Sequence, residues 1–205
     1  MKRLLWLLSL ILLLVSCATM NDSDLDSTVN NIVKYAHLSE EKAQSFKDAF
    51  IQYYKDNKIS VFYDNLEQCY LISPKGFDYD YALVYFGIDS KGSIWNKLEG
   101  RYSDEDWLYV DKVVFYNTKQ KWTKSNLFSS VKSDVRTTSR NTIVTETFDV
   151  SLKNTDVINL AKIIEGDYSV RLYSVYDNYT TADLKASWKE SQKAVIFLEL
   201  LLLEK

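Results

Sequence analysis

The chain has 205 residues, of which 46% are hydrophobic and 26% charged, which is enough to bury the core of one domain. Its formal net charge of −3 argues against the concentrated basic surface that nucleic-acid binding needs, so we expect no nucleic-acid partner. One histidine and five scattered glycines exclude a multi-histidine metal site and a phosphate-cradling loop, and they disfavour a histidine-based catalytic triad. We therefore expect no metal, no cofactor and no catalytic residues.

The first 17 residues have the layout of an export signal. Lys2 and Arg3 give a positive start, and residues 4–16 form an uncharged apolar run, shorter than the roughly 20 residues that a transmembrane helix needs. The run ends in Leu14-Val15-Ser16-Cys17, which resembles the lipobox of bacterial lipoproteins: an aliphatic residue, a tolerant position, a small residue and then cysteine. The alternative interpretation is a generic signal peptide with a chance cysteine, or an uncleaved anchor.

The lipobox resemblance implies a lipid-anchored protein of the bacterial cell envelope. Residues 1–16 would be removed as a signal peptide, and Cys17 would carry a thioether-linked diacylglycerol and an acyl chain such as palmitate. Two or three acyl chains anchor a protein stably, since each buried methylene contributes about 0.8 kcal/mol. By the enterobacterial sorting rule, Ala18 favours the outer membrane over the cell membrane. Without the two basic residues of the signal the net charge is near −5, so the lipid alone would hold the chain at the membrane.

The segment after the anchor is interpreted as a tether. Residues 17–26 comprise the lipidated cysteine and a polar, acidic stretch, and a single α+β domain is expected at 27–205. With Cys17 lipidated, Cys69 has no intrachain partner, so we expect no disulfide. The apolar neighbours of Cys69 favour a small buried side chain over a nucleophile.

The domain is predicted to open with a helical hairpin and to continue in strands. Residues 27–36 place apolar side chains on one helix face, and Ser39 is expected to cap a second helix in EEKAQSFKDAFIQYYKDN. ISVFYD and QCYLIS are β-prone. Strands are predicted from alternation or from continuous apolar character at residues 79–89, 106–117, 129–138 and 141–152.

The C-terminal part is predicted to contain a helix at NTDVINLAKIIEG, a strand at residues 167–176 and a last helix. The apolar run at 194–203 is too short to span a bilayer, so we expect it to be buried in the domain, with a partner interface as the alternative. Because helices and strands are segregated, the chain is assigned to the α+β class: an N-terminal helical hairpin, a mainly antiparallel sheet of about five to seven strands, and helices on one face, including the C-terminal helix. DWLYVDKVVFY, VTETFDVSL, VINLAKIIEG and YSVRLYS together are similar to uncharacterised exported bacterial α+β domains, a resemblance that implies no activity.

Fifteen tyrosines and five tryptophans are a large aromatic load, of the kind found at interfaces. Alternation puts several tyrosines on one face of the predicted strand 79–89, where the start of the next strand would adjoin them. The candidate partner surface consists of Tyr79, Tyr81, Tyr85, Trp107 and Tyr109. The alternative is a core face closed by the N-terminal helices.

Two acidic features, Glu146 and the pair Asp78 and Asp80, are candidate sites. Alternation places Glu146 on the apolar face of its strand, where a carboxylate is costly unless paired, so a structural ion pair with Arg171 is expected, with Arg136 or Arg140 as alternative partners. Asp78 and Asp80 share a face at a strand start, as paired carboxylates of glycosidases do.

These features lead to two functional hypotheses. The first is a lipid-anchored envelope protein with a non-catalytic binding or structural domain, whose partner is an envelope or host protein or a glycan. The alternative is a hydrolase that acts on envelope glycan through Asp/Glu pairs.

Overall fold

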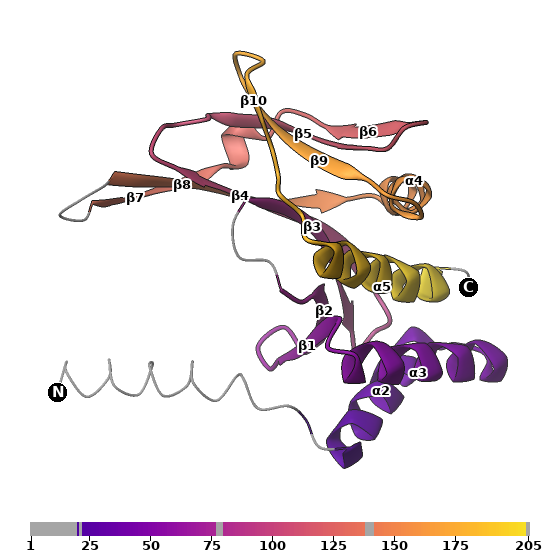
Figure 1. The fold of residues 1–205 in the computed structure, drawn as a ribbon. Helices are drawn as coiled ribbons and strands as arrows, with labels where there is room; N and C mark the ends of the chain where they lie inside the picture. Colours follow the sequence, from indigo (N-terminus) through magenta and orange to yellow (C-terminus); the bar gives the residue numbers. More distant parts are fainter. Residues whose placement is uncertain (1–19, 21, 77–79, 138–141, 204–205) are drawn as a thin grey trace, which may run out of the picture.

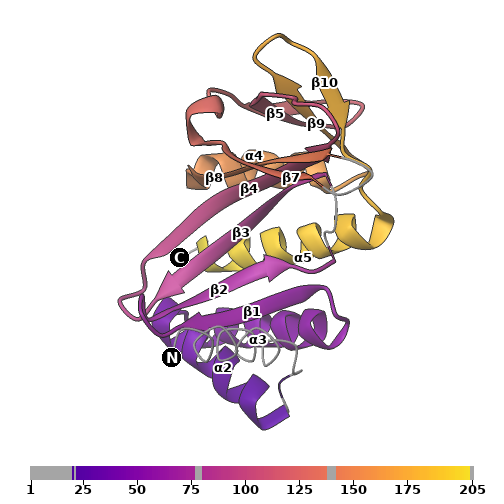
Figure 2. The same ribbon diagram turned by 90° about the vertical axis from the view of Figure 1, so that its left-hand side faces the viewer.

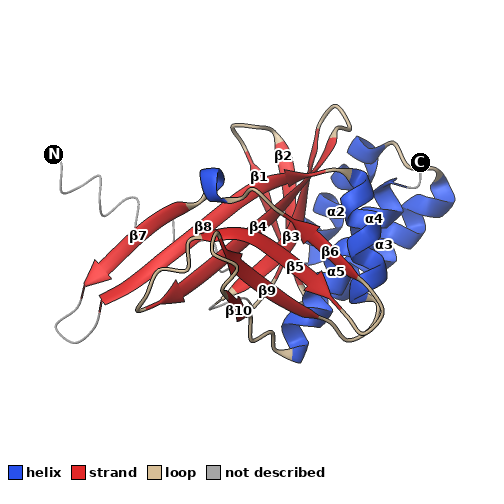
Figure 3. Ribbon diagram, turned by 90° about the horizontal axis from the view of Figure 1, so that it is seen from above, coloured by secondary structure: helices blue, strands red, loops and turns tan. Residues whose placement is uncertain are grey.

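Figure 1 shows the computed structural model of the protein, which describes residues 20, 22–76, 80–137 and 142–203. The predicted signal peptide and the lipobox Leu14-Val15-Ser16-Cys17 therefore lie outside the described residues. The fold belongs to the α+β class, as predicted, with an N-terminal helix pair, a six-stranded antiparallel sheet and a C-terminal helix. Seen from above, the labelled α-helices gather towards one end of the molecule (Figure 3).

The larger sheet, sheet A, is entirely antiparallel and has the strand order β1-β2-β3-β4-β8-β7. Its central strands are long, and β7 and β8 extend beyond the other described helices and strands (Figure 1). All residues of β7 are exposed, as befits an edge strand with alternating charges. The strands are β1 (Ile59–Asp64), β2 (Cys69–Pro74), β3 (Tyr81–Asp89), β4 (Ile94–Asp104), β7 (Lys132–Thr137) and β8 (Thr142–Leu152).

The smaller sheet, sheet B, is a second antiparallel sheet that the sequence did not predict as a separate layer. It has the order β10-β9-β5-β6 and lies over one half of sheet A (Figures 1 and 2). The chain passes from β4 of sheet A to β5 of sheet B through residues 105–109. The strands are β5 (Val110–Tyr116), β6 (Lys121–Lys124), β9 (Ser169–Ser174) and β10 (Tyr179–Thr181), and a short 3-10 helix, η2 (Phe128–Ser130), follows β6.

Four α-helices are present among the described residues. They are α2 (Asp22–Ala36), α3 (Glu40–Lys55), α4 (Asn154–Ile164) and α5 (Ala186–Leu203). The second predicted helix and the helix at α4 are confirmed. The first begins at Asp22, so the expected flexible tether at 17–26 is wrong for its last five residues: Leu25 is buried, and Asp22 and Asp24 favour the helix start by facing its positive end.

The core has two parts, which share the helix α5. One part fills the space between sheet B, α4 and the inner faces of β3, β4 and β8. The other part lies between α2, α3, β1, β2 and the end of β3. Ile196 belongs to the first part, whereas Val195 and Leu198 belong to the second. Because α5 is covered on both sides, its C-terminal half is apolar nearly all round, which confirms that the run at 194–203 is mostly buried within the domain.

A glutamine of α5 also completes the backbone bonding of sheet A. Strand β2 pairs with β3 only as far as the Ile72–Phe86 pair, so Val84 has no strand neighbour on that side. The Val84 N–H donates to Gln192 Oε1 at 2.8 Å, and Gln192 Nε2 donates to the Val84 carbonyl at 3.2 Å. Since Gln192 is fully buried, its amide replaces the missing strand and satisfies two buried backbone groups.

Candidate functional site

Strands β5 and β9 place two different kinds of side chain on the two faces of sheet B. Val113, Phe115, Val170 and Leu172 point into the core. Side chains alternate along a strand, so the intervening residues face outwards. No described helix or strand lies over this outer face (Figure 1).

The outer face of sheet B gathers aromatic and cationic side chains from all four strands. The register pairs Lys112 with Tyr173, Tyr173 with Tyr179, and Tyr116 with Lys121. Cross-strand neighbours on one face lie within contact distance of each other, so these side chains form one surface. We call it the tyrosine–lysine face; it consists of Lys112, Tyr116, Lys121, Arg171, Tyr173 and Tyr179.

Two of the three cations of this face, Lys112 and Arg171, are held against aromatic rings. The Arg171 guanidinium lies 4.8 Å from the Tyr116 ring centre and 4.4 Å from that of Tyr179, so it sits between two rings. The Lys112 ammonium lies 4.5 Å over the ring of Tyr173. Cation–π contacts of this kind restrict the positions of long side chains that otherwise move freely in solvent. The positive charges of Arg171 and Lys112 are thus held in place before any ligand binds.

The tyrosine–lysine face is hollowed. A depression of about 720 Å³ lies over its part on β5, β6 and β9 and over the β5–β6 turn at residues 117–120. Its lining includes four cations, Lys112, Lys119, Lys121 and Arg171, and none of its described lining residues carries a carboxylate. Asp177 reaches Lys112 from outside the lining at 3.0 Å. On a chain with a net charge of −3, this is a local concentration of positive charge.

This arrangement supplies the groups that bind anions. Arginine and lysine side chains form charge-assisted hydrogen bonds with carboxylate, phosphate or sulfate oxygens. The phenol groups add hydrogen-bond donors and acceptors beside them. Hydrolysis through paired carboxylates would need two acids facing the ligand, and the described lining supplies none.

The predicted partner surface is divided by the structure. Tyr79 lies outside the described residues. Tyr81 and Tyr85 are half-buried on the outer face of sheet A and belong to neither part of the core. The Tyr81 hydroxyl donates to Glu99 at 2.6 Å and the Tyr85 hydroxyl to Asp149 at 2.9 Å, so both rings are tied to their own sheet.

Trp107 and Tyr109 lie elsewhere, in the connection from β4 to β5. Their rings stack at 5.8 Å, and they are 40% and 41% exposed. Their segment bonds to Glu146, which points to the inner side of sheet A, opposite to Tyr81 and Tyr85. The expectation of one shared aromatic surface is therefore not supported by the register.

The predicted ion pair between Glu146 and Arg171 is wrong. Glu146 is 1% exposed, and its carboxylate accepts three backbone N–H groups, from Leu108 and Tyr109 at 2.8 Å each and from Val110 at 2.7 Å. Arg171 instead lies on the outer face of sheet B, between its two tyrosines. Burial does require a partner for Glu146, but main-chain donors fill that role.

Of the predicted carboxylate pair Asp78 and Asp80, the structure describes only Asp80. Asp80 accepts the Ser103 N–H at 2.7 Å, and its pKa is raised by burial; Asp78 lies outside the described residues. Glu99 and Asp149 face each other across β4 and β8, each held by a tyrosine hydroxyl. Asp149 also lies 3.6 Å from the Lys97 ammonium. These contacts are those of a polar sheet surface.

The structure describes Cys69 and the helices that could be examined as membrane spans, whereas Cys17 lies outside the described residues. Cys69 is 3% exposed, and burial raises the pKa of its thiol, which fits the predicted inert, buried side chain. Among the described residues, none of the helices has the length and the hydropathy needed to cross a bilayer.

Comparison with known proteins gives no relative: no protein family matches the chain, and no curated protein or solved structure is similar to it.

Proposed function

We propose that this chain is a lipid-anchored protein of the bacterial cell envelope whose domain binds an anionic ligand at the tyrosine–lysine face without catalysing a reaction. The observation that carries the binding role is the fixed position of Arg171 between Tyr116 and Tyr179, in a hollow lined by three further cations. The Arg171 side chain loses conformational entropy when the protein folds. Less side-chain entropy is therefore lost when the ligand binds.

The anchoring role is supported by the first 17 residues. The basic start, the short apolar run and Leu14-Val15-Ser16-Cys17 agree with a lipoprotein signal. A lipid on Cys17 leaves a short segment before α2 begins at Asp22, so the domain would stay close to the membrane surface. The ligand would accordingly be a component of the envelope or of a host surface.

Binding of a labelled polyanion tests the proposed site. We expect the full chain, purified in nonionic detergent, to bind fluorescein-labelled dextran sulfate, with an affinity that falls steeply as salt is added. Arg171→Gln is expected to weaken binding by about tenfold, because it removes the central fixed charge. Fluorescence anisotropy gives the affinities.

Two further variants make this test specific. Lys121→Gln removes an exposed cation of the face and is expected to weaken binding without disturbing the fold. Lys132→Gln is the matched control, since Lys132 is an exposed strand lysine on β7 of the other sheet. Equal affinities for the wild type, Arg171→Gln and Lys121→Gln would rule out this face as the site.

A further inference from the structure

We infer that the anionic ligand is an acidic oligosaccharide chain, which crosses the strands of sheet B and continues around the β5–β6 turn to Lys162 on α4. This inference rests on the proposed function and names the ligand class of the same site. It is carried by the shape of the hollow, by the placement of the cations along it, and by the covered faces of the tyrosine rings.

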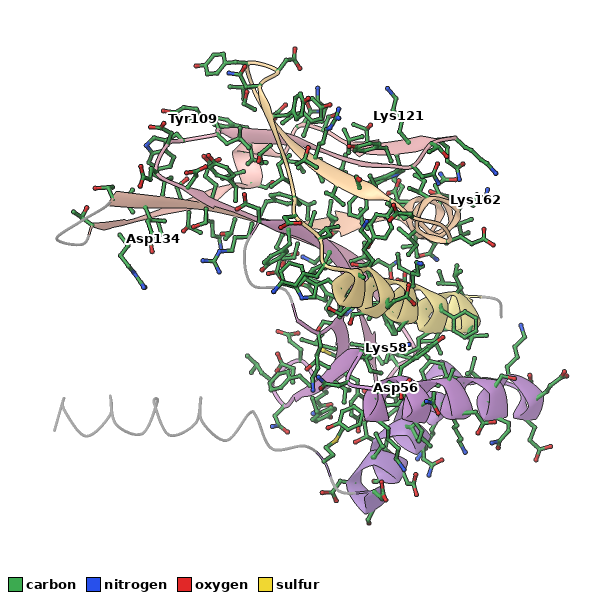
Figure 4. All side chains as sticks on the ribbon, in the orientation of Figure 1. Asp56, Lys58, Tyr109, Lys121, Asp134 and Lys162 are labelled. Carbon is green, nitrogen blue, oxygen red and sulfur yellow. The ribbon has the colours of Figure 1, made fainter. Side chains whose placement is uncertain are left out.

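The hollow on sheet B continues beyond the sheet. A second depression, of about 620 Å³, lies between the β5–β6 turn and the C-terminal end of α4. The two depressions share all four residues of the turn, Asn117, Thr118, Lys119 and Gln120. Lys162 lines the second depression, and Figure 4 shows Lys121 and Lys162 at the same end of the molecule. The path is therefore longer than one small anion requires.

The turn that joins the two depressions is held in place by α4. The Asn117 side chain donates to the Ile163 carbonyl at 2.9 Å, and the Gln120 side chain donates to the Lys162 carbonyl at 2.8 Å. The Asn117 side-chain oxygen also accepts the N–H groups of Lys119 and Gln120, at 2.8 and 2.9 Å. These bonds cap the last carbonyls of α4 and fix the backbone that carries Lys119 and Lys121 relative to Lys162.

The cations line this path on three strands and on the turn. The register pairs Lys112 with Tyr173, Arg171 with Val114 and Lys121 with Tyr116, so these three cations lie at successive levels about 7 Å apart along β5, on the neighbouring strands β5, β9 and β6. Lys119 and Lys162 extend the series around the turn. A chain of acidic sugars carries one anion on each charged ring, so several of its charges would meet cations along this path.

The second depression also carries two carboxylates. Glu165 and Asp167 line it together with Lys162. Asp167 is neutralised in part by Lys189, at 2.6 Å, and this contact lowers the pKa of Asp167. Glu165 is therefore the carboxylate that an anionic chain at Lys162 would have to avoid.

The aromatic rings argue for a sugar chain rather than a single-stranded nucleic acid. Nucleic-acid strands bind such sheets by stacking their bases on open aromatic faces. Here Arg171 covers faces of Tyr116 and Tyr179, and Lys112 covers a face of Tyr173. What the surface offers is charge, phenol hydroxyls and the exposed hydroxyl-bearing Thr123, which are the partners of carboxylates and sugar hydroxyls.

A length series of oligogalacturonates tests this inference on the full chain in nonionic detergent. We expect calorimetric affinity to rise at least about tenfold from the dimer to the hexamer, because each added ring binds at a high effective concentration. Lys162→Gln is expected to reduce affinity by a factor that grows with chain length, since only longer chains reach it. Lys132→Gln, on the other sheet, should leave every affinity unchanged.

Three results would overturn the inference: one affinity for all chain lengths, equal losses from Lys162→Gln at every length, or binding of a thymidine hexanucleotide as tight as that of hexagalacturonate. Maltohexaose, a neutral chain of the same length, is expected not to bind. Binding of dextran sulfate distinguishes a failure of the proposed ligand class from a failure of the proposed function. If it binds at the tyrosine–lysine face while the galacturonate series fails, the ligand class is wrong; if it does not bind there, the proposed function itself fails.

Discussion

Replacing Glu146 with leucine is expected to remove much of the folding free energy of this protein. The substitution leaves the N–H groups of Leu108, Tyr109 and Val110 without their acceptor at the crossing between the two sheets. A hydrogen bond to a charged group contributes about 1.5–3 kcal/mol, so a loss of about 4 kcal/mol or more is expected from a total of about 5–15 kcal/mol. Urea unfolding followed by tryptophan fluorescence measures this loss.

Further variants distinguish the three backbone hydrogen bonds to Glu146, which we call the backbone clamp, from an ion pair. Glu146→Gln keeps one acceptor oxygen and is expected to lie between the wild type and Glu146→Leu. Thr147→Val, at the neighbouring position on the opposite face of β8, serves as the control and should change stability by less than about 1 kcal/mol. Arg171→Gln should not rescue Glu146→Leu. A Glu146→Leu protein as stable as the Thr147→Val control would contradict the clamp.

Glu199 is expected to destabilise the protein increasingly as the pH rises. It is fully buried on α5, and neither carboxylate oxygen has a hydrogen-bond partner among the described residues. Burial raises the pKa of Glu199 from an ordinary value of 4.5 to about 8. Between these values the folded state keeps a proton that the unfolded state releases, so stability falls with rising pH by a total on the order of 5 kcal/mol.

The comparison with Glu199→Gln isolates this contribution. The variant cannot ionise, so its stability advantage over the wild type should be small near pH 4.5, grow through neutral pH and level off above about pH 8. Glu190→Gln is the control on the same helix, because Glu190 is exposed and pairs with Lys193 at 2.9 Å. Its effect should stay below about 1 kcal/mol at every pH. Parallel stability curves for Glu199→Gln and the wild type would show that Glu199 finds a partner or solvent.

The helices were predictable because their apolar spacing is a local property. In α4, Val157, Leu160 and Ile164 recur at helical intervals, and these residues are buried. The start of α2 was missed because its first residues are polar and acidic, a composition that also suits a tether. At the start of α2, the burial of Leu25 in the core favours the helix.

Strand β4 was not predicted, although it lies at the centre of sheet A. Its inner face carries Asn96 and Gly100 among its apolar residues, which breaks the expected alternation. The space above Gly100 is filled by the ring of Phe148, where an added Cβ would come within 2.1 Å of a ring carbon. Because Asn96 is polar and Gly100 is covered by the ring of Phe148, the apolar alternation in the sequence of β4 is interrupted.

The tyrosine–lysine face was only half visible in the sequence. Two of its strands were predicted, and the alternation of Arg171 with Leu172 and Tyr173 shows which side chains share a face. That these strands are neighbours, and that Tyr179 on β10 joins them, depends on long-range pairing. Likewise, the burial of Glu146 was predicted, but its backbone partners were not. Almost every residue has a backbone N–H group, so the sequence does not show which of them bond to Glu146.

The proposed ligand requires the domain to lie outside the cytoplasm, because an acidic envelope glycan would not meet a cytoplasmic protein. Metabolic labelling with an alkyne fatty acid in a bacterial host tests this directly. We predict that the wild-type chain incorporates the label and fractionates with membranes, whereas Cys17→Ala incorporates none. Label absent from the wild type, or present equally in Cys17→Ala, would contradict the account.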